Sequence, residues 1–138
     1  FWRPLWQYVT VTCDDILTEI DMESGEFNDG HKISKTKANR IASRLKKLDK
    51  DGSTMKYELK YKEYLKSLPQ EECGICEGTG LRNDELGKNA RKRDPSYTCN
   101  GCSGKGEKDN FETYYPFESD VIMRFAEFCE NSGGFEIC

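Results

Sequence analysis

The sequence has a single histidine, His31. One histidine is too few for the ligand sets of most catalytic zinc sites, which combine histidines or carboxylates with an open position. The G-x-S-x-G, Walker A and H-E-x-x-H motifs are also absent, and with them the commonest sequence signs of acyl transfer, nucleotide hydrolysis and zinc proteolysis. We therefore predict that the protein is not an enzyme.

Long apolar runs are missing as well, because no stretch approaches the roughly 18 residues of a membrane span. No positively charged segment followed by an apolar core marks a secretory signal. The seven cysteines form an odd set, whereas secreted disulfide scaffolds usually pair an even one. We expect a cytoplasmic protein with no membrane partner, whose thiols are reduced or bound to a metal.

Charge is distributed unevenly along the chain. Residues 1–31 carry one basic and seven acidic side chains, residues 32–66 carry twelve basic and four acidic, and residues 110–138 carry one basic and six acidic. The basic middle either packs beside acidic ends that neutralise it, or forms a face for an anionic partner. We favour neutralisation and keep the anionic partner as the alternative.

Apolar periodicity predicts a mainly α-helical fold. Ser34 is placed to cap one helix, Pro69 to end another, and Gly133 to stop the last. Residues 23–31 are predicted to be a loop, and residues 135–137 either add a short strand or pack against the core. The predicted helices cover residues 4–22, 35–49, 54–68 and 116–132.

Residues 70–109 are rich in glycine and have no helical period. Two segments, Cys73–Gly80 and Cys99–Gly106, both read C-x-x-C-x-G-x-G. Two residues between thiolates let one tight turn point both sulfurs at one ion, and two such turns complete a Cys₄ shell. The pattern predicts one structural Zn²⁺, and the alternatives are a pair of disulfides or a redox Cys-x-x-Cys. The predicted ligands are Cys73, Cys76, Cys99 and Cys102.

The other three cysteines and the insertion between the cysteine pairs have simpler explanations. The 22 residues between Cys76 and Cys99 are expected to form a surface loop. Cys13 and Cys129 lie on predicted apolar helix faces, so we interpret them as core residues rather than as a second metal site with Cys138 and His31.

The two cysteine segments resemble half of the zinc finger of the DnaJ (Hsp40) co-chaperones. That family has four C-x-x-C-x-G-x-G repeats and two zinc ions, so two repeats in residues 73–106 imply one zinc. In that family the finger helps to bind unfolded chains or partner proteins, which implies a protein partner here. There is no His-Pro-Asp triplet, so stimulation of Hsp70 is not implied. The flanking segments resemble small phage-encoded proteins.

Three groups of residues are candidate ligand contacts. A cation between two indoles suits a planar ligand, a polar turn before a helix attracts anions, and basic side chains on a helix face or in the zinc loop suit phosphates. The alternative roles are core anchoring, helix capping and solvation. The candidates are Trp2, Arg3, Trp6, Asn28, Asp29, His31, Arg40, Arg44, Lys88, Arg91, Lys92 and Arg93.

These observations predict a small helical domain of about four helices with an inserted Cys₄ zinc-knuckle module. The helical region covers residues 1–69, the zinc module residues 70–109, and residues 110–138 form a helix and tail that pack on the helical region. The leading hypothesis is a zinc-stabilised, non-enzymatic binding or adaptor protein with a protein partner. The first alternative is nucleic-acid or nucleotide binding, and the second is a small enzyme using His31 and Asp29.

Overall fold

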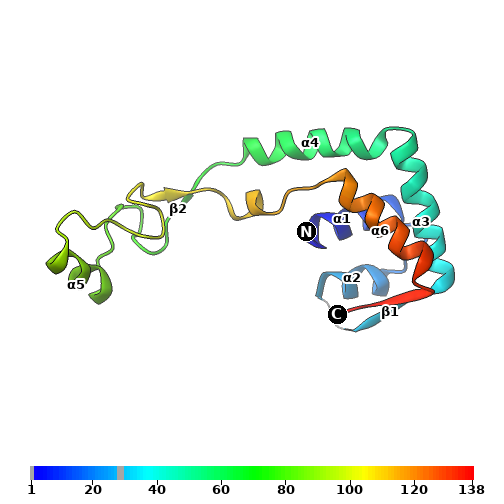
Figure 1. Ribbon diagram of the computed structural model, residues 1–138, viewed down its shortest axis with the longest axis horizontal. Coiled ribbons are helices and arrows are strands. Elements are labelled where there is room, and N and C mark those ends of the chain that lie inside the picture. The colour runs from blue at the N-terminus through cyan, green and yellow to red at the C-terminus, as the bar shows by residue number, and fades with distance from the viewer. Residues whose placement is uncertain (1, 28–29) are drawn as a thin grey trace. The chain divides into compact units, whose positions relative to one another are not determined.

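The computed structural model describes residues 2–27 and 30–138 (Figure 1). The described residues are mainly α-helical, as predicted, but they form six α-helices rather than about four. The α-helices are α1 (Trp2–Thr12), α2 (Glu19–Phe27), α3 (Lys35–Lys50), α4 (Ser53–Ser67), α5 (Glu85–Arg93) and α6 (Ser119–Asn131), with a 3-10 helix, η1 (Phe111–Tyr114). The strands are β1 (His31–Ser34), β2 (Glu71–Glu72), β3 (Glu107–Lys108) and β4 (Gly134–Ile137).

The chain divides into two compact units. The helical unit comprises the residues up to Leu65 together with Tyr115–Cys138, and the cysteine unit comprises Lys66–Tyr114. Each unit has its own cluster of buried side chains.

The helix predicted over residues 4–22 is two helices in the structure. α1 ends at Thr12, and α2 begins only at Glu19. The backbone N–H of Thr18 donates to the Asp21 carboxylate at 2.7 Å, and the Asp21 N–H donates back to the Thr18 hydroxyl at 3.3 Å. This reciprocal pair is a capping box, which starts a new helix. The loop predicted over 23–31 is wrong at both ends, because α2 continues through Phe27 and β1 begins at His31.

Two indoles fix α2 against α1. The Trp2 Nε1 donates to the carbonyl of Gly25 at 2.7 Å, and the Trp6 Nε1 donates to the carbonyl of Met22 at 3.0 Å. A Cβ on Gly25 would lie 2.0 Å from the Trp6 ring. Glycine at this position therefore lets the helix backbone approach the buried indole.

α3 and α6 form the centre of the helical unit, and the sheet of β1 and β4 lies beside them (Figure 1). One face of α3 is buried, and the Ser34 hydroxyl caps the helix, as predicted, by accepting from the Lys37 N–H. β1 and β4 pair antiparallel with Ile33 opposite Phe135. Of the two alternatives for the C-terminal residues, a short strand is the one that forms, and β1 is its unpredicted partner. The buried residues of α3 are Ala38, Ile41, Ala42 and Leu45.

α4 is attached to the helical unit mainly through aromatic rings. The Tyr57 ring lies 4.8 Å from that of Tyr8 and 4.8 Å from that of Phe117, measured between centroids. Beside them, the Tyr8 hydroxyl is hydrogen-bonded to that of Thr54 at 3.0 Å. Edge-on ring pairs of this kind add to the area they bury, so the aromatic cluster holds α4 in place.

α6 begins at Ser119 rather than at Pro116 as predicted, and its first turn is capped from another helix. No side chain of the preceding segment caps it. Instead the Glu58 carboxylate of α4, only 8% exposed, accepts from the Ser119 N–H at 2.8 Å. Hydrogen bonds from Lys62 and from Ser119 hold the pKa of Glu58 below its usual value. An anionic cap at a helix N-terminus also interacts favourably with the helix dipole.

Replacing Glu58 with alanine is expected to lower the free energy of unfolding by about 1–2 kcal/mol, because the Ser119 N–H loses its partner. Urea denaturation followed by tryptophan fluorescence measures the change. Glu63→Ala, an exposed position on the same helix, is the matched control and should change stability by less than about 0.5 kcal/mol. Equal effects of the two substitutions would contradict this role.

Candidate metal centre

The four cysteines of the two C-x-x-C-x-G-x-G segments converge in the cysteine unit. All four are buried, and their sulfur atoms lie within 4.8 Å of one another. The Sγ atoms of Cys73 and Cys99 are 3.9 Å apart, and those of Cys76 and Cys102 are 3.7 Å apart. A tetrahedral shell with zinc–sulfur bonds of about 2.3 Å has sulfur–sulfur edges of about 3.8 Å. The cluster therefore fits a zinc ion, as in a zinc-finger-like module.

The glycines of the motif bring backbone N–H groups to the sulfurs. The Gly80 N–H donates to the Cys76 Sγ at 3.3 Å, and the Gly106 N–H donates to the Cys102 Sγ at 3.2 Å. Both glycines have positive φ, at 73° and 83°, which glycine adopts without strain. N–H donors favour the thiolate form that binds metal. The motif therefore supplies the polar groups around the ligands as well as the ligands.

The two cysteine segments also brace each other. The Cys73 N–H donates to the carbonyl of Gly106 at 2.8 Å, and the Cys99 N–H donates to the carbonyl of Gly80 at 2.8 Å. In each segment the first cysteine thus donates to the last glycine of the other segment. β2 and β3 pair antiparallel next to the first of these bonds, with Glu72 opposite Glu107. These backbone bonds hold the two cysteine segments against each other.

Hydrogen bonding and burial act in opposite directions on the thiols. Hydrogen bonds from the backbone N–H groups of Ile75 and Cys76 lower the pKa of Cys73. Burial raises the pKa of Cys76. Metal binding requires thiolates and releases protons, so a dication would have to stabilise the charge that burial disfavours at Cys76.

The insertion between the cysteine pairs was predicted to be a surface loop. The structure differs, because the insertion contains the helix α5. The Asp84 side chain caps this helix by accepting from the Gly87 N–H at 2.9 Å, and Arg82 contacts the same carboxylate at 2.8 Å. Gly87 is buried against the carbonyl of Arg82, where a Cβ would lie 1.9 Å from the oxygen. Asp84 therefore begins a helix inside the segment that was predicted to be a loop.

Most of the basic candidate residues in the insertion contact other groups of the cysteine unit. Arg91 donates to the Arg82 carbonyl at 2.7 Å and to Asn83 at 3.3 Å. Lys92 donates to Asn89 at 3.2 Å. Lys88 lies 3.7 Å from Glu85, and Arg93 is exposed at the end of α5.

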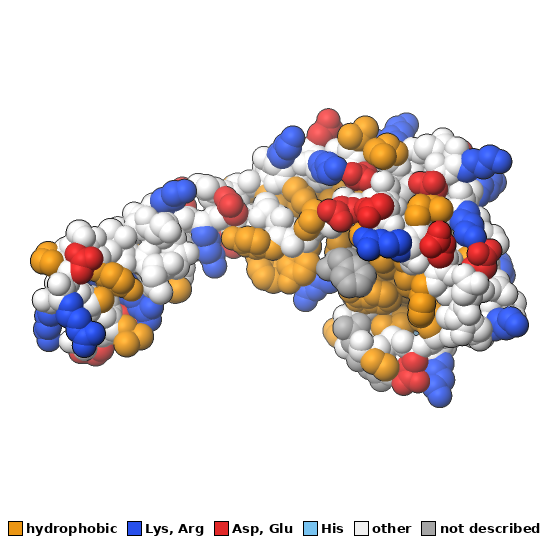
Figure 2. Space-filling model, in the orientation of Figure 1, with side chains coloured by type: hydrophobic (Ala, Val, Ile, Leu, Met, Phe, Trp, Pro, Cys, Tyr) orange, Lys and Arg blue, Asp and Glu red, His pale blue; other side chains and the backbone are white. Residues whose placement is uncertain are grey.

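Three of the seven basic side chains of α3, those of Lys37, Arg44 and Lys46, pair with acidic groups from both ends of the chain. Arg44 donates to the Thr12 carbonyl at 2.6 Å and to Asp15 at 2.9 Å. Lys46 pairs with Glu130 at 2.5 Å, whereas Arg40 is exposed. Figure 2 shows basic and acidic side chains interspersed on the visible face. These pairs neutralise part of the basic segment, in the way that the favoured interpretation of the charge pattern predicted.

The tryptophan candidates do not hold a cation between them. The Trp2 and Trp6 rings stack on each other with centroids 5.2 Å apart and 13° between their planes. Arg3 instead lies over the Tyr115 ring, 5.6 Å from its centroid. Because both indole N–H groups are bonded to α2, the structure places these tryptophans as core anchors.

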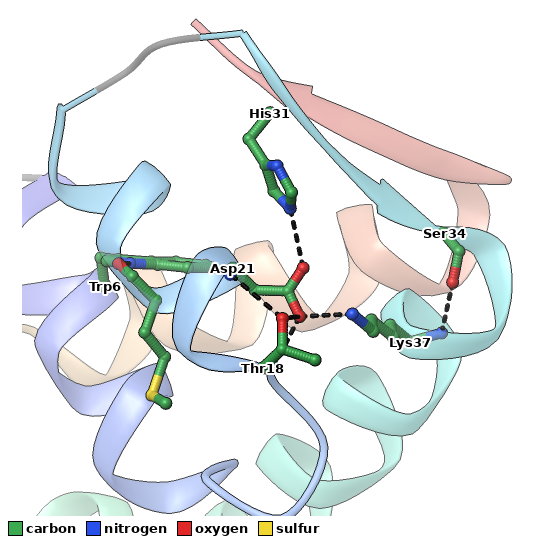
Figure 3. A network of polar contacts seen from close by, with 7 residues as sticks. Trp6, Thr18, Asp21, His31, Ser34 and Lys37 are labelled. Carbon is green, nitrogen blue, oxygen red and sulfur yellow. Dashed lines mark hydrogen bonds and ion pairs between the residues drawn. The ribbon is translucent and has the colours of Figure 1, made fainter.

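His31 belongs to a polar network around a residue that sequence reasoning missed. Asp21 is 1% exposed, and its carboxylate accepts from the Thr18 N–H at 2.7 Å and lies 2.8 Å from the His31 Nε2. Lys37 also pairs with this carboxylate. Figure 3 shows Thr18 from the loop before α2, His31 from β1 and Lys37 from α3 converging on Asp21. The Thr18-x-x-Asp21 capping pattern was the available signal. Asn28 and Asp29, the other candidates of this turn, lie outside the described residues.

The network makes stability depend on pH in the acid range. Burial by itself would raise the pKa of Asp21, but hydrogen bonds from Lys37, Thr18 and His31 outweigh burial and hold that pKa far below its usual value. The unfolded chain titrates near its ordinary value of about 3.9. The stabilisation by the Asp21 carboxylate is therefore complete above that pH and lost below it.

We expect the difference in unfolding free energy between the wild-type protein and Asp21→Asn to shrink as pH falls from about 6 to about 3. Urea denaturation at each pH checks this. Tryptophan fluorescence is a suitable probe because both tryptophans, Trp2 and Trp6, lie in the helical unit. A difference that stays constant with pH would show that the carboxylate is not the stabilising group.

The remaining cysteines do not join the cluster. Cys13 and Cys129 are buried in the helical core, and Cys138 is exposed. Burial raises the pKa of Cys129 to about 12. Within residues 2–27 and 30–138, the four clustered cysteines are the only group of three or more His, Cys, Asp or Glu side chains close enough to share an ion.

None of the protein-family models, curated proteins or solved structures compared with the chain matches it. The resemblance to the DnaJ-type finger therefore rests on the two cysteine segments alone. Across the described part of the chain, every helix is too short or too polar to cross a membrane.

Proposed function

We propose that this protein is a non-enzymatic binding protein, stabilised by one structural zinc ion, that acts on a protein partner. The observation that carries the proposal is the ring of four buried cysteines. Four thiolates fill a tetrahedral zinc ion and leave no position for a substrate or a water molecule. The ion would then contribute folding free energy rather than chemistry.

A protein partner is supported by the apolar side chains that the cysteine unit leaves in solvent. Ile75, at the tip of the first cysteine segment, is 50% exposed, and Leu81 and Leu86 are 45% and 66% exposed. The buried core of the cysteine unit consists of the four cysteines. Exposed apolar groups on a rigid frame are typical of protein–protein contacts. The resemblance to the DnaJ-type finger favours the same partner class.

The nucleic-acid alternative has less support, because Lys37, Arg44 and Lys46 are paired with carboxylates inside the helical unit. These pairs take up part of the positive charge that phosphates would contact, whereas Lys35, Arg40, Lys47 and Lys50 of the same helix are exposed. We also propose a reducing, cytoplasmic environment, because all seven cysteines are free thiols in the structure.

Capture from a lysate of the source cells tests the proposal, with the wild-type chain compared against the double variant Ile75→Ser/Leu86→Ser. We expect specific proteins to bind the wild-type chain and to be lost from the double variant. Native mass spectrometry should find one zinc ion per chain in both, which separates loss of the surface from loss of the fold.

Ile20→Ser is the matched control, since Ile20 is 65% exposed but lies in the helical unit. It should capture the same proteins as the wild-type chain. Identical capture by all three chains would exclude the cysteine unit as the binding surface. A wild-type protein that contains no metal would contradict the proposal of a structural zinc ion.

A further inference from the structure

An apolar groove runs along the outer face of α6. Val121, Phe125 and Phe128 recur at helical spacing. Two hollows of about 450 Å³ each lie on this face and share Phe125. Trp2 and Phe135 form walls of one of them, and Phe128 is 49% exposed at the rim. We call these two hollows the α6 groove.

Two of the three charged side chains that line the α6 groove are acidic. Glu118 lines one hollow and Glu136 the other. Arg124 also lines the groove but pairs with Asp120 at 3.1 Å, and Lys32 lies 3.8 Å from Glu136. The segment 110–138 as a whole carries one basic and six acidic side chains. An occupant should therefore be apolar at its centre and basic at its edges.

α4 presents a surface with that composition. Met55 and Leu59 lie one turn apart and are 51% and 56% exposed. Lys56 and Lys60 follow them directly in the sequence and are exposed. The opposite side of α4 is used by Tyr57 and its aromatic neighbours, so this outer face has no partner among the described residues. Figure 2 shows hydrophobic and basic side chains together over α4. We call it the α4 face.

We infer that the α4 face of one copy of this protein docks in the α6 groove of a second copy. The apolar pair Met55 and Leu59 enters the groove, and Lys56 and Lys60 approach the acidic rim. Methionine and leucine adapt well to an irregular aromatic hollow. Because the two surfaces are different, the contact is head-to-tail and leaves one free α4 face and one free α6 groove on every dimer.

Sedimentation velocity on the full chain tests the contact. The wild-type protein should associate at low salt on the order of 100 µM protein, and association should weaken in about 1 M salt, where the Debye length is about 3 Å. Leu59→Asp places a charge in the apolar centre of the α4 face, and Phe128→Asp places one in the α6 groove. Each variant alone should associate at least about tenfold more weakly than the wild-type protein. A wild-type protein that is monomeric at both salt concentrations overturns the inference.

Mixing the two variants is the sharper test. Leu59→Asp retains the α6 groove and Phe128→Asp retains the α4 face, so an equimolar mixture should form a 1:1 dimer that grows no further. A symmetric contact of either surface with itself would not be rescued by mixing, so a monomeric mixture overturns the head-to-tail arrangement.

Val11→Asp is the matched control, because Val11 is 66% exposed on α1 and should leave association unchanged. Tryptophan fluorescence confirms that each variant is folded. Loss of association in Val11→Asp would count against the assigned surfaces. The experiment does not depend on the zinc proposal, since all variants keep the four cysteines.

Discussion

Removing the metal is expected to unfold the cysteine unit and to leave the helical unit folded. The four cysteines are the buried core of Lys66–Tyr114, so without an ion the unit has little to keep it folded. Structural zinc in small modules contributes apparent binding free energies of about 10–16 kcal/mol. The helical unit has a separate core of aliphatic and aromatic residues and does not need the ion.

Chelation followed by hydrogen exchange and tryptophan fluorescence measures both effects in one sample. Amides of the two cysteine segments should lose protection, while the fluorescence of Trp2 and Trp6 stays unchanged. Cys76→Ser should have the same effect without a chelator, and Cys138→Ser, an exposed cysteine outside the cluster, is its control. A cysteine unit that keeps its protection without metal would show that backbone bonds alone hold it.

Gly80→Ala and Gly106→Ala are expected to weaken zinc binding by about 100-fold each, equivalent to about 3 kcal/mol. A Cβ at Gly80 would lie 2.3 Å from the carbonyl oxygen of Gly104, and one at Gly106 would lie 2.2 Å from that of Gly78. Both positions also have positive φ, which disfavours alanine. The backbones must separate to admit a methyl group, and the N–H bonds to the sulfurs lengthen.

Gly74→Ala is the matched control for these substitutions. It lies between two ligands, but no heavy atom is within 4 Å of its Cβ position. Competition with a zinc-binding dye gives the affinity of each variant. Zinc affinity should be nearly unchanged in Gly74→Ala. If all three glycine variants bound zinc equally well, the close packing of the two segments would not be needed for the site.

Local patterns predicted the parts of the fold that neighbouring residues determine. The apolar stripe and the Ser34 cap defined α3 to within one residue at its end. The cysteine and glycine spacing identified a cluster that the structure brings together. Both patterns act over a few residues, because caps, helix faces and tight turns depend on near neighbours.

Other features could not be predicted because they depend on distant partners. Apolar residues recur at helical spacing from Leu5 through Leu17, although α1 ends within this stretch. Periodicity alone therefore predicted one helix where the structure has two, α1 and α2. Glu58 caps α6 from 61 residues away, and Asp21 is stabilised by Lys37 from 16 residues away. No local pattern records such pairings.

The sequence by itself determined that the protein is mainly helical and that four cysteines form one cluster, because each of these properties is repeated within a short segment. Only the tertiary structure decided which charges are neutralised and which apolar faces are left in solvent. α4 and α6 each have an apolar stripe in the sequence, and burial depends on which side the rest of the chain covers. The aromatic cluster and the Glu58 cap fix the orientation of both helices. These tertiary contacts therefore decide which residues form the α4 face and the α6 groove.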